Sequence, residues 1–423
     1  MIINGGKTLK GDIVISGAKN ASLPLMVASI LTAEELILTN LPQVADIATM
    51  VNLLINLGCE VNFNGNDPEL GNQGKVITLC AKHIINPCAD YNLVRKMRAS
   101  IFILGPLLAR VGYAKVSLPG GCAIGTRPID LHVKGLEKLG ATFELKDGYI
   151  EGKVNGKLKG ADVHFEKISV GATENILMAA CLAEGETNIF NAACEPEIID
   201  LAKCLSAMGA KIKGAGTSQI TVQGVDSLHS ARHKIIADRI EAGTYAIAAG
   251  ITKGKINLHG LESWIFNGFK QDLEKAGLIF KQIASDIIEV SCSNISSTNI
   301  STNPYPGFPT DMQAQFMALM TVANGASTIE ENIFENRFMH VLELNRMGAN
   351  IEYHGKIAVV KGSKKLQGAE VMATDLRASV SLVLAGLVAE GQTVINRLYH
   401  LDRGYESLAE KLINCGADIK ITY

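Results

Sequence analysis

Aromatic residues are scarce in this chain. They make up 5% of its 423 residues, with a single tryptophan, which counts against a surface that stacks nucleic-acid bases. Lysine and arginine total 40 against 42 acidic residues, a formal net charge of −2, so no basic excess favours nucleic acid or an acidic membrane surface. The most apolar runs, such as residues 379–389, are shorter than a membrane span. We therefore expect no nucleic-acid partner and no membrane insertion.

Metal and disulfide patterns are also missing. The nine cysteines are scattered without a CxxC pair, and the nine histidines form no HExxH motif, so we expect neither a zinc site nor a disulfide framework. Scattered thiols are typical of the reducing cytoplasm. Gly6-Lys7-Thr8 imitates the end of a phosphate-binding P-loop, but the required earlier glycine is absent because Met1 occupies its position. No cofactor is indicated.

What is present is an ordinary globular composition, 47% hydrophobic and 19% charged, in a chain long enough for two or three domains. The opening residues, MIINGGKTLKGDIVISG, contain no apolar signal core. Their Asn-Gly-Gly step between two alternating runs predicts a strand pair joined by a turn.

One phrase recurs at intervals of roughly 70 residues: a leucine-rich helix end, a glycine and an apolar strand start. Glycine just past a helix is the usual left-handed cap. Each copy therefore predicts a helix, a cap and a strand. The six glycines are Gly58, Gly140, Gly209, Gly277, Gly348 and Gly416.

A second phrase alternates with the first and consists of small-residue-rich segments that are apolar nearly all round. Such segments are typical of buried helices. Six repeats of two helices and several strands predict an α/β protein built by internal duplication. The six segments are 20–31, 98–109, 170–183, 241–252, 311–323 and 375–389.

Two groups of three repeats are the natural division. We expect one domain over residues 20–235 and a second over residues 1–19 plus 236–423, with chain crossings near Lys19-Asn20 and near 230–238. Two domains joined by two crossings can hinge around a cleft.

Cations stand at several of the predicted helix starts, where the helix dipole makes a positive charge unfavourable unless it faces a carboxylate or an anionic ligand. For any one of them a solvated or ion-paired role is the simpler interpretation. Taken together they favour a cleft for a compact anion, held by paired hydrogen bonds. The cations are Lys19, Arg98, Arg127, Arg377 and Arg403.

A glycine-rich stretch, LPGGCAIGTR (118–127), carries a cysteine. Its glycines predict a mobile loop, and a partly exposed thiol near a cation can be reactive. Alternatively, Cys122 fills a small apolar niche.

Eight motifs in order resemble the enolpyruvyl transferases that act on UDP-N-acetylglucosamine, and the likeness runs from Met1 to the last helix. The motifs are SGAKNASLP (16–24), YNLVRKMRASI (91–101), LPGGCAIGTRPIDLH (118–132), ISVGATENI (168–176), FPTDMQAQF (308–316), FENRFMHV (334–341), MATDLRAS (372–379) and DRGYE (402–406).

This resemblance implies a two-domain inside-out α/β barrel fold, each domain having three βαβαββ-like units, with the active site in the cleft between the domains. It also implies transfer of the enolpyruvyl group of phosphoenolpyruvate to the 3′-hydroxyl of UDP-N-acetylglucosamine with release of phosphate. That reaction is the first committed step of peptidoglycan synthesis, and it proceeds through a tetrahedral intermediate.

The resemblance assigns roles residue by residue. Cys122 becomes the proton donor, the thiol that adds to phosphoenolpyruvate and the target of fosfomycin. Asp311 becomes the candidate base, although a plain helix cap is the alternative. Lys19, Arg127 and Arg403 would clamp phosphoenolpyruvate, with Asn20 beside them. The expected contacts to the sugar nucleotide are Arg98, Arg127, Pro128, Ile129, Asp130, Leu131, Lys167, Ser169, Val170, Gly171 and Ile333.

Some residues keep two interpretations. Asp375 and Arg377 would line the cleft or form an internal ion pair, and Glu195 and Glu197 have a similar standing. Cys194 stands where the family pattern has arginine, which removes one cation. Two other functions stay open: the sibling enzyme that acts on shikimate 3-phosphate, and a non-catalytic repeat protein that only binds nucleotides.

Overall fold

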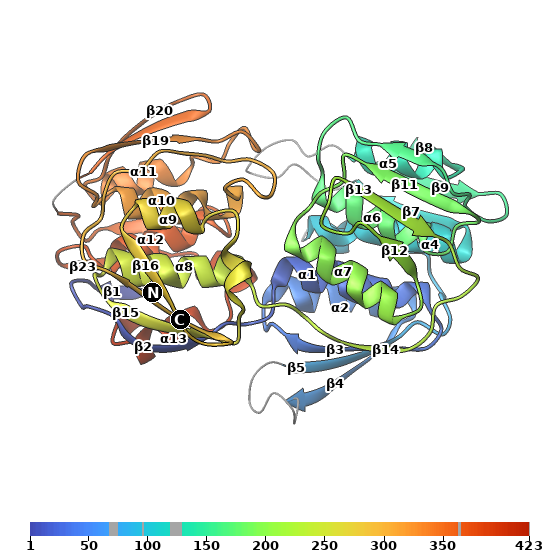
Figure 1. The fold of residues 1–423 in the computed structure, drawn as a ribbon, viewed down its shortest axis with the longest axis horizontal. Helices are drawn as coiled ribbons and strands as arrows, with labels where there is room; N and C mark the ends of the chain where they lie inside the picture. The colour runs from blue at the N-terminus through green and yellow to red at the C-terminus, as the bar shows by residue number, and fades with distance from the viewer. Residues whose placement is uncertain (67–74, 95–96, 119–128, 363–364, 423) are drawn as a thin grey trace. The chain divides into compact units, whose positions relative to one another are not determined.

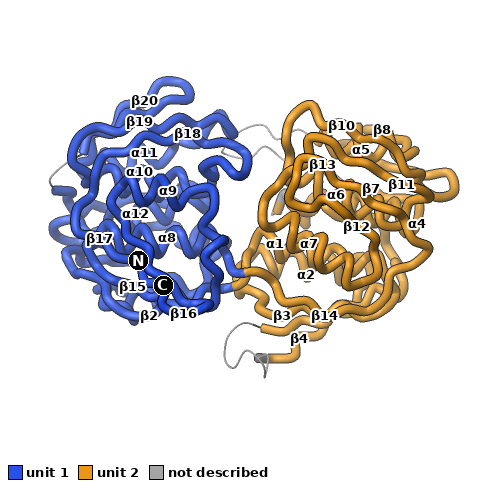
Figure 2. The backbone as a smooth tube through the Cα atoms, viewed as in Figure 1, with its two compact units in different colours: residues 1–16, 122–126, 237–423 blue, residues 17–121, 127–236 orange. Residues whose placement is uncertain are grey.

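The computed structural model describes residues 1–66, 75–94, 97–118, 129–362 and 365–422. These fold as two compact units (Figure 2). Unit 1 contains the described residues among 1–16 and 237–423, and unit 2 those among 17–121 and 127–236. The chain thus passes between the units at 16/17 and 236/237, close to the 19/20 and 235/236 positions expected from the sequence.

The described strands form six four-stranded sheets, three in each unit. Unit 2 contains the sheet β14 (Ala231–Lys234), β3 (Glu35–Leu41), β5 (Lys75–Cys80), β4 (Glu60–Asn66); the sheet β6 (Cys88–Ala89), β7 (Tyr113–Ser117), β9 (Tyr149–Val154), β8 (Ala141–Lys146); and the sheet β10 (Asp162–His164), β11 (Glu186–Phe190), β13 (Gln219–Gln223), β12 (Lys211–Lys213).

Unit 1 repeats this plan (Figure 1). Its sheets are β2 (Lys10–Val14), β15 (Lys255–His259), β17 (Ile287–Cys292), β16 (Leu278–Ala284); β18 (Ile300–Ser301), β19 (Ala326–Glu330), β21 (Ile357–Lys361), β20 (Asn350–His354); and β22 (Glu370–Met372), β23 (Gln392–Asn396), β1 (Ile2–Asn4), β24 (Asp418–Lys420). In every sheet the first two strands are parallel and the remaining pairs are antiparallel.

The N-terminal strands do not form the hairpin that the Asn-Gly-Gly step predicts. β1 lies between β23 and β24 and pairs with both, while β2 pairs in parallel with β15 of another sheet. Both edges of β1 are therefore occupied. The segment after β1 leads to a different sheet, where β2 pairs with β15. β1 therefore belongs to the sheet of the last repeat.

The small-residue segments form buried helices, as predicted. In unit 2 these are α1 (Lys19–Ala28), α4 (Leu104–Val111) preceded by the 3₁₀ helix η2 (Arg98–Ile103), and α6 (Val170–Ala180). In unit 1 they are α8 (Arg239–Ile251), α10 (Gln313–Met320) preceded by η4 (Thr310–Met312), and α12 (Ala378–Gly386). Helices of each trio pack against one another, because a helix that is apolar on all sides is buried on all sides.

In each repeat, the other helix is followed by a glycine one or two residues after its last residue. These helices are α2 (Ala45–Leu57), α5 (Asp130–Lys138), α7 (Pro196–Ala207), α9 (Lys270–Lys275), α11 (His340–Arg346) and α13 (Leu408–Asn414). All six glycines that the repeat singled out have φ between 86° and 103°. The predicted left-handed caps are confirmed. No helix within the described ranges is both long and apolar enough to cross a membrane.

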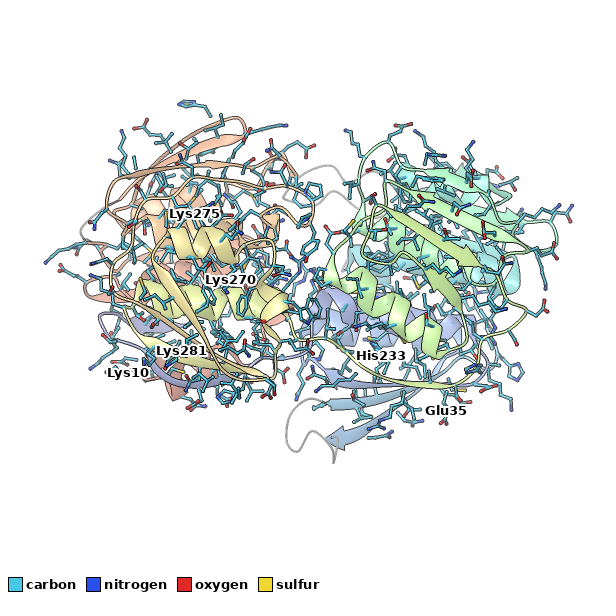
Figure 3. The ribbon with its side chains drawn as sticks, in the orientation of Figure 1. Lys10, Glu35, His233, Lys270, Lys275 and Lys281 are labelled. Carbon is cyan, nitrogen blue, oxygen red and sulfur yellow. The ribbon has the colours of Figure 1, made fainter. Side chains whose placement is uncertain are left out.

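Acid–base pairs hold the chain beside the passages at 16/17 and 236/237, which lie within the described residues. In unit 1, Glu241 accepts the backbone N–H of Ser16 at 2.8 Å and pairs with the Lys411 ammonium at 2.6 Å. In unit 2, His233 on β14 (labelled in Figure 3) lies 2.9 Å from Asp200, whose other oxygen accepts the N–H of Ile236 at 3.2 Å. The segments that leave each unit are thus held by buried carboxylates.

Candidate active site

Asp311 lies between two guanidinium groups in unit 1. Its Oδ1 accepts from Nη2 of Arg337 at 2.8 Å and its Oδ2 from Nε of Arg377 at 3.3 Å. The arginine side chains are only 6% and 2% exposed, whereas that of Asp311 is 26% exposed. Two adjacent cations favour the charged carboxylate, and an ionised, accessible carboxylate is what a general base requires. Asp311 is the second residue of η4, whose N-cap residue is Pro309.

Arg377 begins the buried α12 and is itself buried. Burial opposes its charge, but the Asp311 carboxylate raises the pKa of the guanidinium. The group also lies 5.5 Å from the Tyr405 ring centroid. Tyr405 also interacts with the guanidinium, and this contact adds to the rise in its pKa.

Asp375 caps the start of α12. Its carboxylate accepts the backbone N–H groups of Arg377 and Ala378 at 2.8 and 2.9 Å. Carboxylates at a helix N-terminus satisfy donors that the helix cannot. The guanidinium of Arg377 forms its ion pair with Asp311.

The DRGYE segment is tied to the helix starts through Tyr405. The Tyr405 hydroxyl is 3.0 Å from Oγ1 of Thr244 on α8 and 3.1 Å from Nε2 of Gln315 on α10. Nε2 of Gln315 also donates to the backbone oxygen of Asp311 at 2.8 Å. The half-buried Arg403 lies two residues before Tyr405, in η5 (Leu398–Arg403).

Arg337 was not singled out from the sequence, although its motif FENRFMHV was. Its place within that recognised motif was the signal available in the sequence. In the same motif, His340 is buried, and this burial lowers its pKa to about 4, with Asp375 opposing the effect and Arg337 adding to it. A neutral imidazole therefore stands beside the charged cluster.

In unit 2, Lys19 opens α1 and is buried. Its ammonium is 2.7 Å from Oδ2 of the buried Asp46 on α2. The cation at this helix start thus faces a carboxylate, which is the condition that the sequence argument set for it. Asn20 follows as the second residue of α1 and is half-buried.

The starts of α5 and α6 meet at Asn175. Its amide nitrogen donates to the backbone oxygen of Ile101 at 3.0 Å and lies 3.0 Å from Nδ1 of His132, and its oxygen accepts the N–H of Gly105 at 2.7 Å. Asn175 is fully buried. It therefore joins η2, the start of α4 and the first turn of α5 to α6, the helix that follows the predicted contacts at 169–171.

Gly171 allows a close approach at this junction. A Cβ there would lie 3.0 Å from the Phe102 ring and 3.3 Å from the His132 ring. Ser169 caps α6 by accepting the N–H of Ala172 at 3.3 Å. The remaining predicted residues here range from half-buried to exposed: Ile129, Leu131 and Val170 are half-buried, and Asp130 and Lys167 are exposed.

Glu195 and Glu197, at the start of α7, are buried in unit 2, with exposed fractions of 7% and 3%. Burial and the charges of these two residues raise the pKa of the buried Glu174 well above its usual value. Cys194 adjoins them and is half-buried, and burial raises the pKa of its thiol. The Glu195 carboxylate adds to this rise.

Four predicted site residues lie wholly or partly outside the described part of the chain. Cys122, Arg127 and Pro128 fall within the undescribed residues 119–128. The backbone of Arg98 belongs to η2, but its side chain is not described.

Comparison with solved structures defines the fold. An enolpyruvyl transferase, NikO from Streptomyces tendae, superposes with a TM-score of 0.88 at 22% identity, covering 99% of this chain and 98% of that one. EPSP synthase from Acinetobacter baumannii superposes with a TM-score of 0.72 at 18% identity, covering 98% of this chain and 97% of that one. The chain has the α/β fold of the enolpyruvyl transferases.

The family follows from sequence. The profile of EPSP synthase (3-phosphoshikimate 1-carboxyvinyltransferase) matches residues 3–412, and the chain belongs to this family. A UDP-N-acetylglucosamine 1-carboxyvinyltransferase of Paramagnetospirillum magneticum is 59% identical over 419 residues, 99% of this chain and 97% of that protein. Proteins of the same name from Rhodospirillum centenum and Rickettsia bellii are 56% and 54% identical, covering 99% of this chain and 98% and 99% of theirs.

Proposed function

We propose that this protein transfers the enolpyruvyl group of phosphoenolpyruvate to the 3′-hydroxyl of UDP-N-acetylglucosamine and releases phosphate, the first committed step of peptidoglycan synthesis. The observation that carries the proposal is the 59% identity, over nearly the full chain, to a protein named for this activity. The charged cluster of unit 1 is chemically suited to it, because a carboxylate base and buried guanidinium groups serve proton transfer and anion binding.

The proposed chemistry assigns an acid, a base and a clamp. Cys122 donates a proton to the methylene carbon of phosphoenolpyruvate, and the sugar hydroxyl adds to the central carbon as Asp311 takes its proton. The tetrahedral intermediate then expels phosphate as a proton leaves the new methyl group. Lys19, Arg127 and Arg403 hold the phosphoenolpyruvate, and preorganised cations stabilise the charge that develops on it.

The proposal assigns contacts to the sugar nucleotide in each of the two units. In unit 2, the hydrogen bonds of Asn175 to Ile101 and His132 support the proposed contacts, because they fix α6 against η2 and α5. A helix start capped by its own serine leaves other backbone N–H groups for an anion. Ile333 of unit 1 is assigned a packing contact to the nucleotide. The cytoplasmic location expected from the cysteines stays a prediction.

Transfer to shikimate 3-phosphate is the second candidate, favoured by the name of the family profile. The solved EPSP synthase structure is only 18% identical in sequence to this chain. The relatives named for the sugar nucleotide are 54–59% identical to it. A non-catalytic nucleotide-binding role would leave the Asp311 cluster without a use.

A phosphate-release assay separates these functions. The purified chain is mixed with phosphoenolpyruvate and either UDP-N-acetylglucosamine or shikimate 3-phosphate. We expect release only with the sugar nucleotide, and little release from Cys122→Ser or Asp311→Ala variants that melt normally. Release with shikimate 3-phosphate alone would reject the proposal, and release with neither acceptor would favour the binding protein.

A further inference from the structure

Glu331 is a buried carboxylate that organises the chain next to the candidate base. It directly follows β19 and is 1% exposed. Its Oε1 accepts the backbone N–H groups of Ile333 and Phe334 at 2.9 and 3.1 Å. Both of its oxygens lie 2.9 Å from the hydroxyl of Thr310. A buried carboxylate with this many donors is fixed in place.

Thr310 passes this constraint to an arginine. A hydroxyl has one proton and two lone pairs, and the proton of Thr310 is directed to Glu331. A lone pair of Thr310 Oγ1 then accepts from Nη1 of Arg337 at 3.1 Å. If the hydroxyl turned its proton away from Glu331, it would lose its hydrogen bond to that carboxylate. Toward Arg337 the hydroxyl therefore acts only as an acceptor.

Arg337 in turn orients the candidate base. Its Nη2 donates to Oδ1 of Asp311 at 2.8 Å while Nη1 is held by Thr310. The guanidinium is a rigid planar fork, so fixing one Nη atom fixes the direction of the other. Glu331, Thr310, Arg337 and Asp311 therefore form one continuous chain of hydrogen bonds.

We propose that Thr310 and Glu331 are positioning residues for the transfer reaction, acting through Arg337 to hold the Asp311 carboxylate in its reactive orientation. This inference rests on the proposed function, in which Asp311 receives the proton of the sugar hydroxyl. Glu331 also holds the backbone at Ile333, so the segment assigned to the nucleotide and the base are set by the same carboxylate.

The charged groups around Asp311 determine how breaking this chain of hydrogen bonds changes the protonation of its carboxylate. Arg337 faces it from the segment after β19, and Arg377 faces it from the start of α12. Beyond them, Tyr405 lies against Arg377, and His340 and Asp375 act on the Arg337 side. Releasing Arg337 removes a guanidinium group that faces the carboxylate, and a carboxylate with weaker cationic support is protonated at higher pH.

The test compares Thr310→Val with Thr310→Ser, which restores the hydroxyl, and with Thr321→Val. Thr321 is a matched control, because it is a buried threonine at the end of α10 whose hydroxyl donates to the backbone of its own helix. The full-length variants are assayed for phosphate release with phosphoenolpyruvate and UDP-N-acetylglucosamine across pH, after their melting temperatures have been measured.

We expect Thr310→Val to lower kcat by roughly tenfold to a hundredfold, since small misplacements of a reacting group have effects of that order. KM values should change by less than about threefold, and the acidic limb of the kcat profile should move to higher pH. Thr310→Ser and Thr321→Val should resemble the wild type. Glu331→Gln should shift kcat in the same direction as Thr310→Val, whereas the half-buried neighbour Glu330→Gln should not.

Two failures are distinguishable. An active wild type whose Thr310→Val variant keeps its kcat and pH profile would overturn the inference alone. The inference also fails if Thr310→Ser is as impaired as Thr310→Val, because packing of the methyl group and not the hydroxyl would then matter. A wild type that transfers nothing to the sugar nucleotide would overturn the proposed function and this inference with it.

Discussion

Replacing Lys411 by methionine removes the cation that faces a buried carboxylate at the point where the chain leaves unit 1. Glu241 is 2% exposed, and its carboxylate is bonded to Lys411 and to the N–H of Ser16. Breaking a buried ion pair by removing one partner costs about 3–5 kcal/mol. For a unit of this size, about 1 kcal/mol shifts Tm by roughly 2–4 °C. We therefore expect Lys411→Met to melt roughly 6–20 °C below the wild type at pH 8.

The loss should depend on pH with a definite sign. Burial raises the pKa of Glu241, and the Lys411 charge opposes that rise. Without Lys411 the folded-state pKa rises further above its unfolded value of about 4.3. Between those two values the folded state holds the extra proton, so stability increases as pH falls. The Tm difference between variant and wild type should therefore be smaller at pH 5.5 than at pH 8.

Scanning calorimetry of the full chain measures this, with two controls. Lys361→Met breaks an exposed pair with Glu352 in the same unit, and such pairs contribute less than about 1 kcal/mol. Lys411→Met combined with Glu241→Gln removes both charges and should recover most of the lost Tm. A Lys411→Met variant that melts with the wild type at pH 8, or whose deficit grows at pH 5.5, would refute the reasoning.

Three further predictions concern the proposed site. Asn175→Leu leaves the partners of three buried hydrogen bonds unpaired and should cost about 2–4 kcal/mol in calorimetry while raising KM for the sugar nucleotide; an unchanged Tm would count against it. Gly171→Leu should clash with the ring of Phe102 and raise that KM with a smaller effect on the KM of phosphoenolpyruvate, as steady-state kinetics would report. Cys122→Asp should retain some turnover but form no fosfomycin adduct by intact-protein mass spectrometry; a drug-sensitive variant would exclude the thiol assignment.

The sequence by itself determined the repeat architecture. Glycines at fixed intervals predicted six left-handed helix caps, and segments apolar on all sides predicted six buried helices; both are present. These features are local, because a cap needs one residue without a Cβ and an all-apolar helix has no face that favours water. The motifs likewise named Asp311 and Arg377 as members of one site.

Only the tertiary structure decided which residues meet. Periodicity could not indicate that β1 and β2 join different sheets, because their partners lie more than 200 residues away in sequence. Nor could it indicate that Arg377 faces Asp311 and not the nearer Asp375, or that Arg337 and Thr310 complete the cluster. Hydrogen-bond partners are set by where helix starts converge in three dimensions, and that convergence results from the packing of whole repeats rather than from the residues beside each side chain.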